Sequence, residues 1–272
     1  MFCRAEPAVL KPIILENQNH ISGLFTAGLI ADKGEITETS GQEGSSYVVR
    51  YSSKDNRILQ KMDLPSTYTA RGITEVGNKL YLLTLKQHKL FILRSYSFEF
   101  VESLNFSGEG WGIAYDGMSF ITSDGGSRLQ FRDSKSFEVH RSLGVYEGAK
   151  NWRKLSELEF AQGLIWATVE QSPIILAVDP TTGEVVGKAD LSDLVQENQL
   201  ADGEATPSGI AYDKEANGFW ITGPHWQSRY LIRFIWYKPL PPAPQAKATS
   251  APKGSTVTNG KPSTPVKDTS SN

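Results

Sequence analysis

The stretch GEGWGIAYDGMSFITSD (108–124) sets the pattern for the whole chain. It holds a Gly, a short apolar strand, a turn at Asp or Gly, and a second apolar strand. Four other segments follow this pattern: FTAGLIADKGEITETSG (25–41), ARGITEVGNKLYLLT (70–84), LSELEFAQGLIWAT (155–168) and PSGIAYDKEANGFWITG (207–223). Their anchors Gly28, Gly72, Gly112, Leu158 and Gly209 are 44, 40, 46 and 51 residues apart. Such a period is typical of a closed array of repeats.

The number of strands in each unit predicts how the array closes. The first four units contain about four strand-like runs each, whereas the fifth contains only SGIAYD, GFWITG and RYLIRFIWY. One spare strand-like run, residues 8–16 with Pro12 at an edge or bulge, precedes the first unit. Four strands at this period are typical of a propeller blade, whereas an open sandwich would not explain the period. We therefore predict an all-β fold, a five-bladed β-propeller closed by pairing of Ile13–Leu15 with Tyr230–Tyr237.

Two further segments carry local predictions. Residues 190–200, DLSDLVQENQL, predict one or two helical turns with Asp190 as the N-cap. From Lys238 onward the chain is rich in Pro, Ser, Thr and Lys and contains no aromatic residue. Such a segment cannot bury enough apolar area to offset the entropy of ordering, which predicts a disordered tail. The sequence thus predicts a propeller over residues 1–237 and a disordered tail over 238–272.

Composition excludes several classes of function. The net charge is −2 with mixed signs, so nothing favours a nucleic-acid or membrane partner. Cys3 is the only cysteine, and His20, His88, His140 and His225 lack metal-ligand spacing. No P-loop, dinucleotide fingerprint or nucleophile elbow is present, so we expect neither a metal nor a cofactor. The N-terminus shows no signal peptide, which by itself predicts a cytoplasmic protein.

Several segments together carry a resemblance to a known family. These are FTAGL (25–29), NKLYLLT (78–84), GEGWGIAYDG (108–117), SDGGSRLQF (123–131), SELEFAQGLIWAT (156–168), VDPTTGEVVGKADLSDL (178–194) and SGIAYD (208–213). In this order they resemble the glutaminyl-peptide cyclotransferases of the plant and bacterial type, over roughly residues 20–235. The resemblance implies a five-bladed propeller without a cofactor, and a family that is mostly secretory or periplasmic. The family reaction converts an N-terminal glutamine to pyroglutamate and releases ammonia.

The chain departs from the family pattern where the resemblance implies a pocket. The family reads EGIT where this chain has Arg71-Gly72-Ile73-Thr74, so the proposed acid/base glutamate is replaced by arginine. A guanidinium does not release its proton in proteins and cannot do this work. The other departures are at Ala27, Leu85, Ser156, Glu170, Ser208 and Pro224. Of the pocket tryptophans that the resemblance implies, Trp111 remains.

These departures predict a glutaminyl-peptide cyclotransferase-like protein that is catalytically impaired and acts as a binding or scaffold propeller. The alternative is an active cyclotransferase with a rearranged site that uses Glu109 or Glu170. A peptide or protein N-terminus is the partner that the resemblance implies. A desolvated arginine needs a partner, so we expect an ion pair between Arg71 and Glu170. The predicted binding residues are Glu109, Trp111, Ser156, Glu170, Ser208 and Trp226.

Three carboxylate-containing stretches have more than one interpretation. Glu109 is either a pocket carboxylate beside Trp111 or a group hydrogen-bonded to neighbouring turns. Glu157 and Glu159 alternate along one strand and therefore share a face, for which a structural role is favoured over a catalytic pair. Residues 124–127, Asp-Gly-Gly-Ser, predict a turn between strands rather than a metal or phosphate site.

Overall fold

The fold is all-β, and the computed structural model describes it for residues 6–198 and 206–237. These residues belong to one compact unit. They hold one short helix, and no helix among them is long and apolar enough to cross a membrane. The tail predicted over 238–272 lies outside the described residues.

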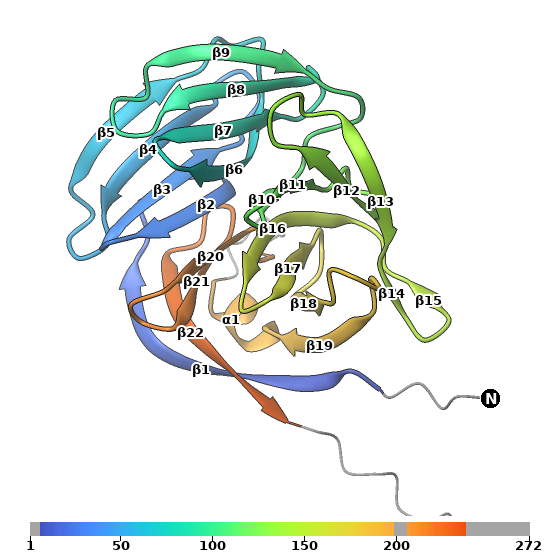
Figure 1. The fold of residues 1–272 in the computed structure, drawn as a ribbon. Coiled ribbons are helices and arrows are strands. Elements are labelled where there is room, and N and C mark those ends of the chain that lie inside the picture. Colours follow the sequence, from blue (N-terminus) through green and yellow to red (C-terminus); the bar gives the residue numbers. More distant parts are fainter. Residues whose placement is uncertain (1–5, 199–205, 238–272) are drawn as a thin grey trace, which may run out of the picture. The chain divides into compact units, whose positions relative to one another are not determined.

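The first three predicted units each form a four-stranded antiparallel sheet (Figure 1). Within each sheet, strands that are neighbours in sequence are hydrogen-bonded, so the order in space follows the order in the chain. The first sheet contains β2 (Thr26–Asp32), β3 (Glu35–Ser40), β4 (Tyr47–Ser52) and β5 (Ile58–Asp63). The second contains β6 (Ala70–Val76), β7 (Lys79–Thr84), β8 (Lys89–Arg94) and β9 (Phe100–Asn105). The third contains β10 (Ile113–Tyr115), β11 (Ser119–Thr122), β12 (Arg128–Asp133) and β13 (Val139–Gly144).

The remaining two units are joined into one eight-stranded sheet, in the order β16-β17-β18-β19-β1-β22-β21-β20. One half holds β16 (Leu155–Ala161), β17 (Leu164–Val169), β18 (Ile174–Val178) and β19 (Val185–Asp190). The other half holds β20 (Gly209–Asp213), β21 (Gly218–Thr222), β22 (Ser228–Tyr237) and the N-terminal strand β1 (Ala8–Asn19). Strand β1 therefore supplies the strand that the fifth unit lacks.

The pairing of β1 confirms the predicted joining of the two chain ends. Its residues pair antiparallel with β22 from Val9↔Tyr237 to Asn19↔Ser228, and Ile13 lies opposite Arg233. Only Ala8 and Val9 pair with β19, in parallel. The edge toward β19 is thus open at Pro12, which has no amide hydrogen to offer a neighbour. A register shift follows between Ile14 and Glu16, and the strand continues to Asn19, beyond the predicted end at residue 16.

The innermost strands of the five units contact one another in a closed order. Strand β2 contacts β6, β6 contacts β10, β10 contacts β16, β16 contacts β20, and β20 contacts β2. The labels of these strands lie near the centre of Figure 1. Buried apolar clusters fill the spaces between successive sheets. One of them joins Leu83 and Leu90 to Ile113 and Phe120, and another joins Leu29 and Ile36 to Ala211 and Trp220.

Glycine allows the innermost strands to approach closely. A β-carbon on Gly112 would lie only 2.2 Å from the Ser156 carbonyl oxygen and 2.7 Å from the Cα of Glu157. Side chains at this position would push β10 away from β16. The recurrent glycines of the sequence pattern therefore serve strand packing in the centre of the fold.

Two local features differ from the sequence-based expectations. Helix α1 spans only Ser192–Glu197, and its N-cap residue is Leu191. Asp190 instead accepts a hydrogen bond from the Ser192 amide at 2.9 Å, in a turn that precedes the helix. A small hairpin, β14 (Tyr146–Glu147) and β15 (Lys150–Asn151), was not predicted, because two-residue strands leave no periodic pattern.

Candidate functional site

Local bulges place several candidate side chains at the centre of the fold. The pairing of β2 with β3 shifts between Thr26 and Gly28, which sets Ala27 in a bulge. The pairing of β6 with β7 shifts between Ala70 and Ile73, around Arg71. That of β16 with β17 shifts between Leu155 and Leu158, around Ser156. A bulge redirects side chains and frees them from the regular alternation.

Arg71 lies against Trp111 rather than in an ion pair. Its guanidinium carbon is 5.7 Å from the centroid of the Trp111 ring. The Arg71 Nε is buried and has no hydrogen-bond partner. Burial lowers the pKa of Arg71, and the charges of Glu170, Glu157 and Glu109 partly oppose that effect. Since arginine starts from so high a pKa, the side chain stays charged.

The predicted ion pair between Arg71 and Glu170 is not formed. Within the described part of the chain, the ion pairs involve other residues. Glu170 still exerts the largest electrostatic effect of the three carboxylates that act on Arg71. It follows β17 and is half-buried, with its amide donating to the Lys154 carbonyl oxygen at 2.9 Å. The two residues therefore interact at longer range than the sequence predicted.

Trp111 and Glu109 hold each other in place next to Arg71. The Trp111 indole Nε1 donates to Glu109 Oε2 at 2.9 Å, and both residues are half-buried. The indole packs on Gly125, where a β-carbon would lie 2.7 Å from the ring atoms. Gly125 has φ +75° and belongs to the predicted turn 124–127, in which Asp124 Oδ1 accepts from the Gly126 amide at 2.9 Å. The turn is confirmed, and it supports the indole.

Arg71, Glu109, Trp111 and Glu170 together are called the Arg71 site below. It contains one cation, an aromatic ring and two half-buried carboxylates.

Ser156 and Ser208 connect strands around this site. The Ser208 hydroxyl donates to the Thr26 carbonyl oxygen at 2.7 Å and thereby ties β20 to β2. The Ser156 carbonyl oxygen accepts from the Ser123 hydroxyl at 2.6 Å. Both serines are buried.

Trp226 is buried, although it is one of the residues that line a cavity of about 470 Å³ with His20 and His225. It is 1% exposed and belongs to the apolar cluster that also contains Leu194 and Tyr230. Its ring packs on Gly223, where a β-carbon would come within 2.5 Å of Nε1. That Nε1 has no hydrogen-bond partner. Most of the side chain is thus taken up by packing within the protein.

Glu157 occupies the centre of the ring of innermost strands. It projects from β16, and its Oε2 lies 2.9 Å from where a β-carbon on Gly72 of β6 would be. The backbone amides of Leu29 and Ile73 act to lower its pKa, but neither makes a hydrogen bond of regular geometry. Burial raises the pKa of Glu157 well above its usual range, and Glu159 adds to the increase. Burial therefore favours the protonated form of this carboxyl group.

A cavity of about 530 Å³ lies beyond Glu157 along the strands. Its lining comes from all five units, through residues such as Ile30, Thr74, Ala114, Glu159 and Tyr212. Along the innermost strands, the residues that line this cavity come after the position of Glu157. The candidate site residues come before that position; they are Ala27, Arg71, Ser156 and Ser208. Burial raises the pKa of Glu159 to about 7, although the Tyr212 amide donates to it at 3.3 Å.

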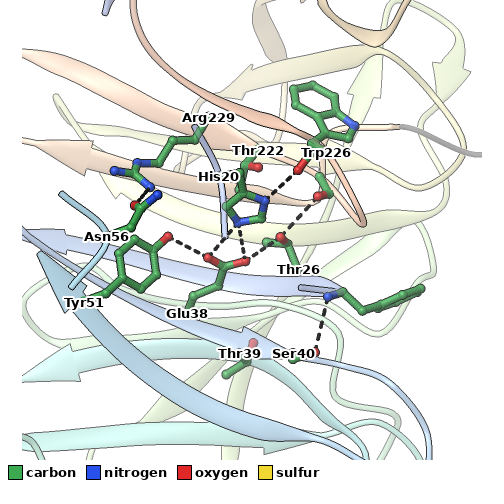
Figure 2. A network of polar contacts seen from close by, with 12 residues as sticks. His20, Thr26, Glu38, Thr39, Ser40, Tyr51, Asn56, Thr222, Trp226 and Arg229 are labelled. Carbon is green, nitrogen blue, oxygen red and sulfur yellow. Dashed lines mark hydrogen bonds and ion pairs between the residues drawn. The ribbon is translucent and has the colours of Figure 1, made fainter. Parts of the chain in front are cut away.

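Sequence reasoning missed a buried polar network around Glu38 (Figure 2). Glu38 of β3 accepts hydrogen bonds from His20 Nε2 at 3.1 Å, from the Tyr51 hydroxyl at 2.8 Å and from the Thr26 hydroxyl. His20 Nδ1 lies 3.0 Å from the Trp226 carbonyl oxygen. Burial alone would raise the pKa of Glu38, but His20 and the other donors outweigh burial and lower it.

The same contacts shift the pKa of His20. Burial acts to lower it, yet the charge and hydrogen bond of Glu38 leave it raised.

The partners of this network come from distant parts of the sequence. Arg229 of β22 lies 5.2 Å from the Tyr51 ring centroid and donates to Gln18 Oε1 at 2.6 Å. The network therefore ties the two chain ends to the first sheet. No spacing signal could reveal it, because its members share no motif.

The described residues contain no group of three or more His, Cys, Asp or Glu side chains that could hold a metal ion. The side chains of the Arg71 site offer charge recognition by Arg71, Glu109 and Glu170, and stacking on Trp111.

Comparisons with known proteins agree with the resemblance seen in the sequence. The family model of glutamine cyclotransferases matches residues 2–234. The glutaminyl-peptide cyclotransferase of Arabidopsis thaliana is 30% identical over 221 residues, covering 79% of this chain and 68% of that protein. The crystal structure of Myxococcus xanthus glutaminyl cyclase matches with a TM-score of 0.80 at 28% identity, covering 85% of this chain and 99% of that chain. The chain therefore belongs to the glutamine cyclotransferase family.

Proposed function

We propose that this protein is a catalytically impaired glutaminyl-peptide cyclotransferase homologue that binds a peptide or protein N-terminus at the Arg71 site. The observation that carries the proposal is the position of Arg71, half-buried in a bulge at the central strands and stacked on Trp111. The family reaction needs a group there that takes and returns a proton while the α-amine attacks the γ-carbonyl and ammonia leaves. A permanently charged guanidinium provides binding and orientation but no proton transfer.

The proposal includes the architecture that presents the site. We infer a five-bladed β-propeller over residues 1–237, with β1 completing the fifth blade. The closed contact order of β2, β6, β10, β16 and β20 supports this arrangement. So do the apolar clusters between successive sheets. In such a fold the ends of the innermost strands surround a central axis, where a ligand contacts several blades at once.

An active cyclotransferase with a relocated proton shuttle is the second candidate. It is favoured by Glu109, whose carboxylate is fixed by the Trp111 indole at 2.9 Å next to Arg71. In that mechanism Glu109 would accept a proton from the α-amine and return one to the departing ammonia. Glu170, the second candidate shuttle, has the larger electrostatic effect on Arg71.

Ammonia release from a glutamine-initiated dipeptide decides between the two candidates. The purified protein is incubated with the peptide. Mass spectrometry then follows the loss of ammonia, about 17 mass units, that accompanies pyroglutamate formation. We expect no turnover above the rate without protein. Robust turnover that disappears in Glu109→Gln or Glu170→Gln would overturn the proposal and identify the shuttle.

A further inference from the structure

We propose that the Arg71 site selects peptides whose N-terminal residue is glutamate, with the side-chain carboxylate on Arg71 and the α-ammonium near Glu109 and Glu170. This inference rests on the proposed function, since it names the class of N-terminus that the same site takes. It starts from a contrast among the buried arginines of the chain.

The other arginines in buried surroundings each have several acceptors. Arg50 donates to Thr37, Glu75 and Ser95. Arg132 donates to the Thr122 hydroxyl and to two backbone carbonyl oxygens. Arg229 donates to Gln18, Asn56 and two backbone carbonyl oxygens. These guanidinium groups are part of the scaffold, because their hydrogen bonds are made within the protein.

Arg71 is the exception among these groups. Its Nε has no partner, which is also true of Arg229, but unlike Arg229 its guanidinium forms no hydrogen bond or ion pair among the described residues. The three carboxylates that act on its charge do so without contact. A buried guanidinium nitrogen without an acceptor is unfavourable, and a ligand carboxylate that contacts it removes that cost. Since the residue is half-buried, part of it stays open to solvent.

The charges around Arg71 define what else the ligand must carry. Burial raises the pKa of Glu157 and favours its protonated form, which weakens its charge interaction with Arg71. Glu109 and Glu170 are half-buried and lie near Arg71 without contacting it. A simple anion would be attracted by Arg71 and repelled by Glu109 and Glu170. A ligand with both a carboxylate and an ammonium group matches all three charges.

An N-terminal glutamate places these two groups on one residue, and its aliphatic stem can lie along the Trp111 ring. An N-terminal glutamine has the same shape and the same ammonium but offers Arg71 only a neutral amide. Hydrogen bonds between two charged groups are roughly twice as strong as neutral ones. The replacement of the family glutamate by Arg71 would thus change the preferred residue from glutamine to glutamate.

Isothermal titration calorimetry with matched peptides tests the inference. The probes are Glu-Ala-Ala-amide, Gln-Ala-Ala-amide and N-acetyl-Glu-Ala-Ala-amide, whose C-terminal amides remove the competing carboxylate. We expect Glu-Ala-Ala-amide to bind at least about tenfold more tightly than either of the others. In Arg71→Gln the preference for glutamate over glutamine should disappear. In Arg71→Lys, which keeps the charge but loses the planar fork, part of it should persist.

Arg94→Gln is the matched control, because Arg94 is exposed on β8 and its partner is Glu99, 3.5 Å away. That variant should keep the full preference, and thermal unfolding of each variant verifies that it is folded. Equal affinities for the glutamate and glutamine peptides, or an unchanged preference in Arg71→Gln, would overturn this inference and leave N-terminus binding intact. Binding of none of the peptides would overturn both. Pyroglutamate formation from the glutamine peptide would overturn the proposed loss of catalysis, whatever the affinities.

Discussion

The carboxyl group of Glu157 faces Gly72 across the centre of the fold, with Oε2 2.9 Å from the position of a β-carbon on that glycine. The side chain of Glu157 on β16 thus occupies the space that Gly72 leaves free on β6, although these two strands are not neighbours. The carboxyl group is fully buried without a regular hydrogen bond. The cavity that contains Glu159 lies further along the same strands.

Glu157→Gln should stabilise the protein at pH 8 and have little effect near pH 4. The folded-state pKa of Glu157 is raised, so the folded protein retains this proton to a higher pH than the unfolded chain, which ionises above its usual value of 4.5. Stability is then lost as pH rises above that value, because the unfolded state binds fewer protons than the native state. Glutamine does not ionise, so the variant should have a free energy of unfolding at pH 8 that is roughly 1–3 kcal/mol larger. Urea unfolding of both proteins at the two pH values measures it, and an equal difference at both would contradict the assignment.

Glu38→Gln should destabilise the protein by about 3–5 kcal/mol at pH 6, because it leaves His20 buried without its ionic partner. The pKa of His20 is raised and that of Glu38 lowered. The pair therefore contributes most between their usual values of 4.5 and 6.5. Its contribution falls as pH rises through the folded pKa of His20, and as pH drops through that of Glu38.

Glu99→Gln is the control for this variant, since Glu99 is exposed and pairs with Arg94 at 3.5 Å. It should change the free energy of unfolding by less than about 1 kcal/mol. Chemical denaturation at pH 6 compares the two variants. Similar losses for both would mean that the buried network contributes no more than a surface pair.

Arg71→Glu should fail to restore ammonia release from a glutamine-initiated dipeptide. Loss of an acid/base typically costs about 10²–10⁴-fold, and loss of an orienting donor about 10²–10³-fold. Such losses overlap when groups act as a unit, so one reversion does not rebuild the pocket. The other departures persist at Ala27, Leu85, Ser156, Glu170, Ser208 and Pro224. Turnover by the single revertant would mean that Arg71 alone blocks the reaction.

Removal of residues 1–18 should sharply lower the melting temperature or the solubility. The deletion takes away most of β1, leaves the edge of β22 unpaired and exposes the core around Leu10, which is 1% exposed. The milder variant Leu10→Ala should cost about 2–5 kcal/mol. Differential scanning fluorimetry of both variants measures the effect. A melting temperature unchanged by the deletion would show that the closure contributes nothing to stability.

The sequence predicted the strand units and the pairing of the chain ends, because both follow from local patterns. Alternating apolar residues and turns at Gly, Asn and Asp specify strands without reference to distant residues. The fifth unit lacks a strand and the N-terminus has one to spare, so the pairing of β1 with β22 followed from the count. The family also followed from sequence, through motifs that build the scaffold.

Only the tertiary structure decided what the candidate side chains contact. The bulge at Arg71 directs the guanidinium toward Trp111 and not into an ion pair with Glu170, and Trp226 turns into the core. The pKa of Glu157 is raised because strands from separate units enclose it. His20 and Glu38 form a pair because the closure of the chain brings the residue that follows β1 to a side chain of β3. Sequence spacing determines such contacts only along one strand, whereas burial and charge partners depend on which strands the fold brings together.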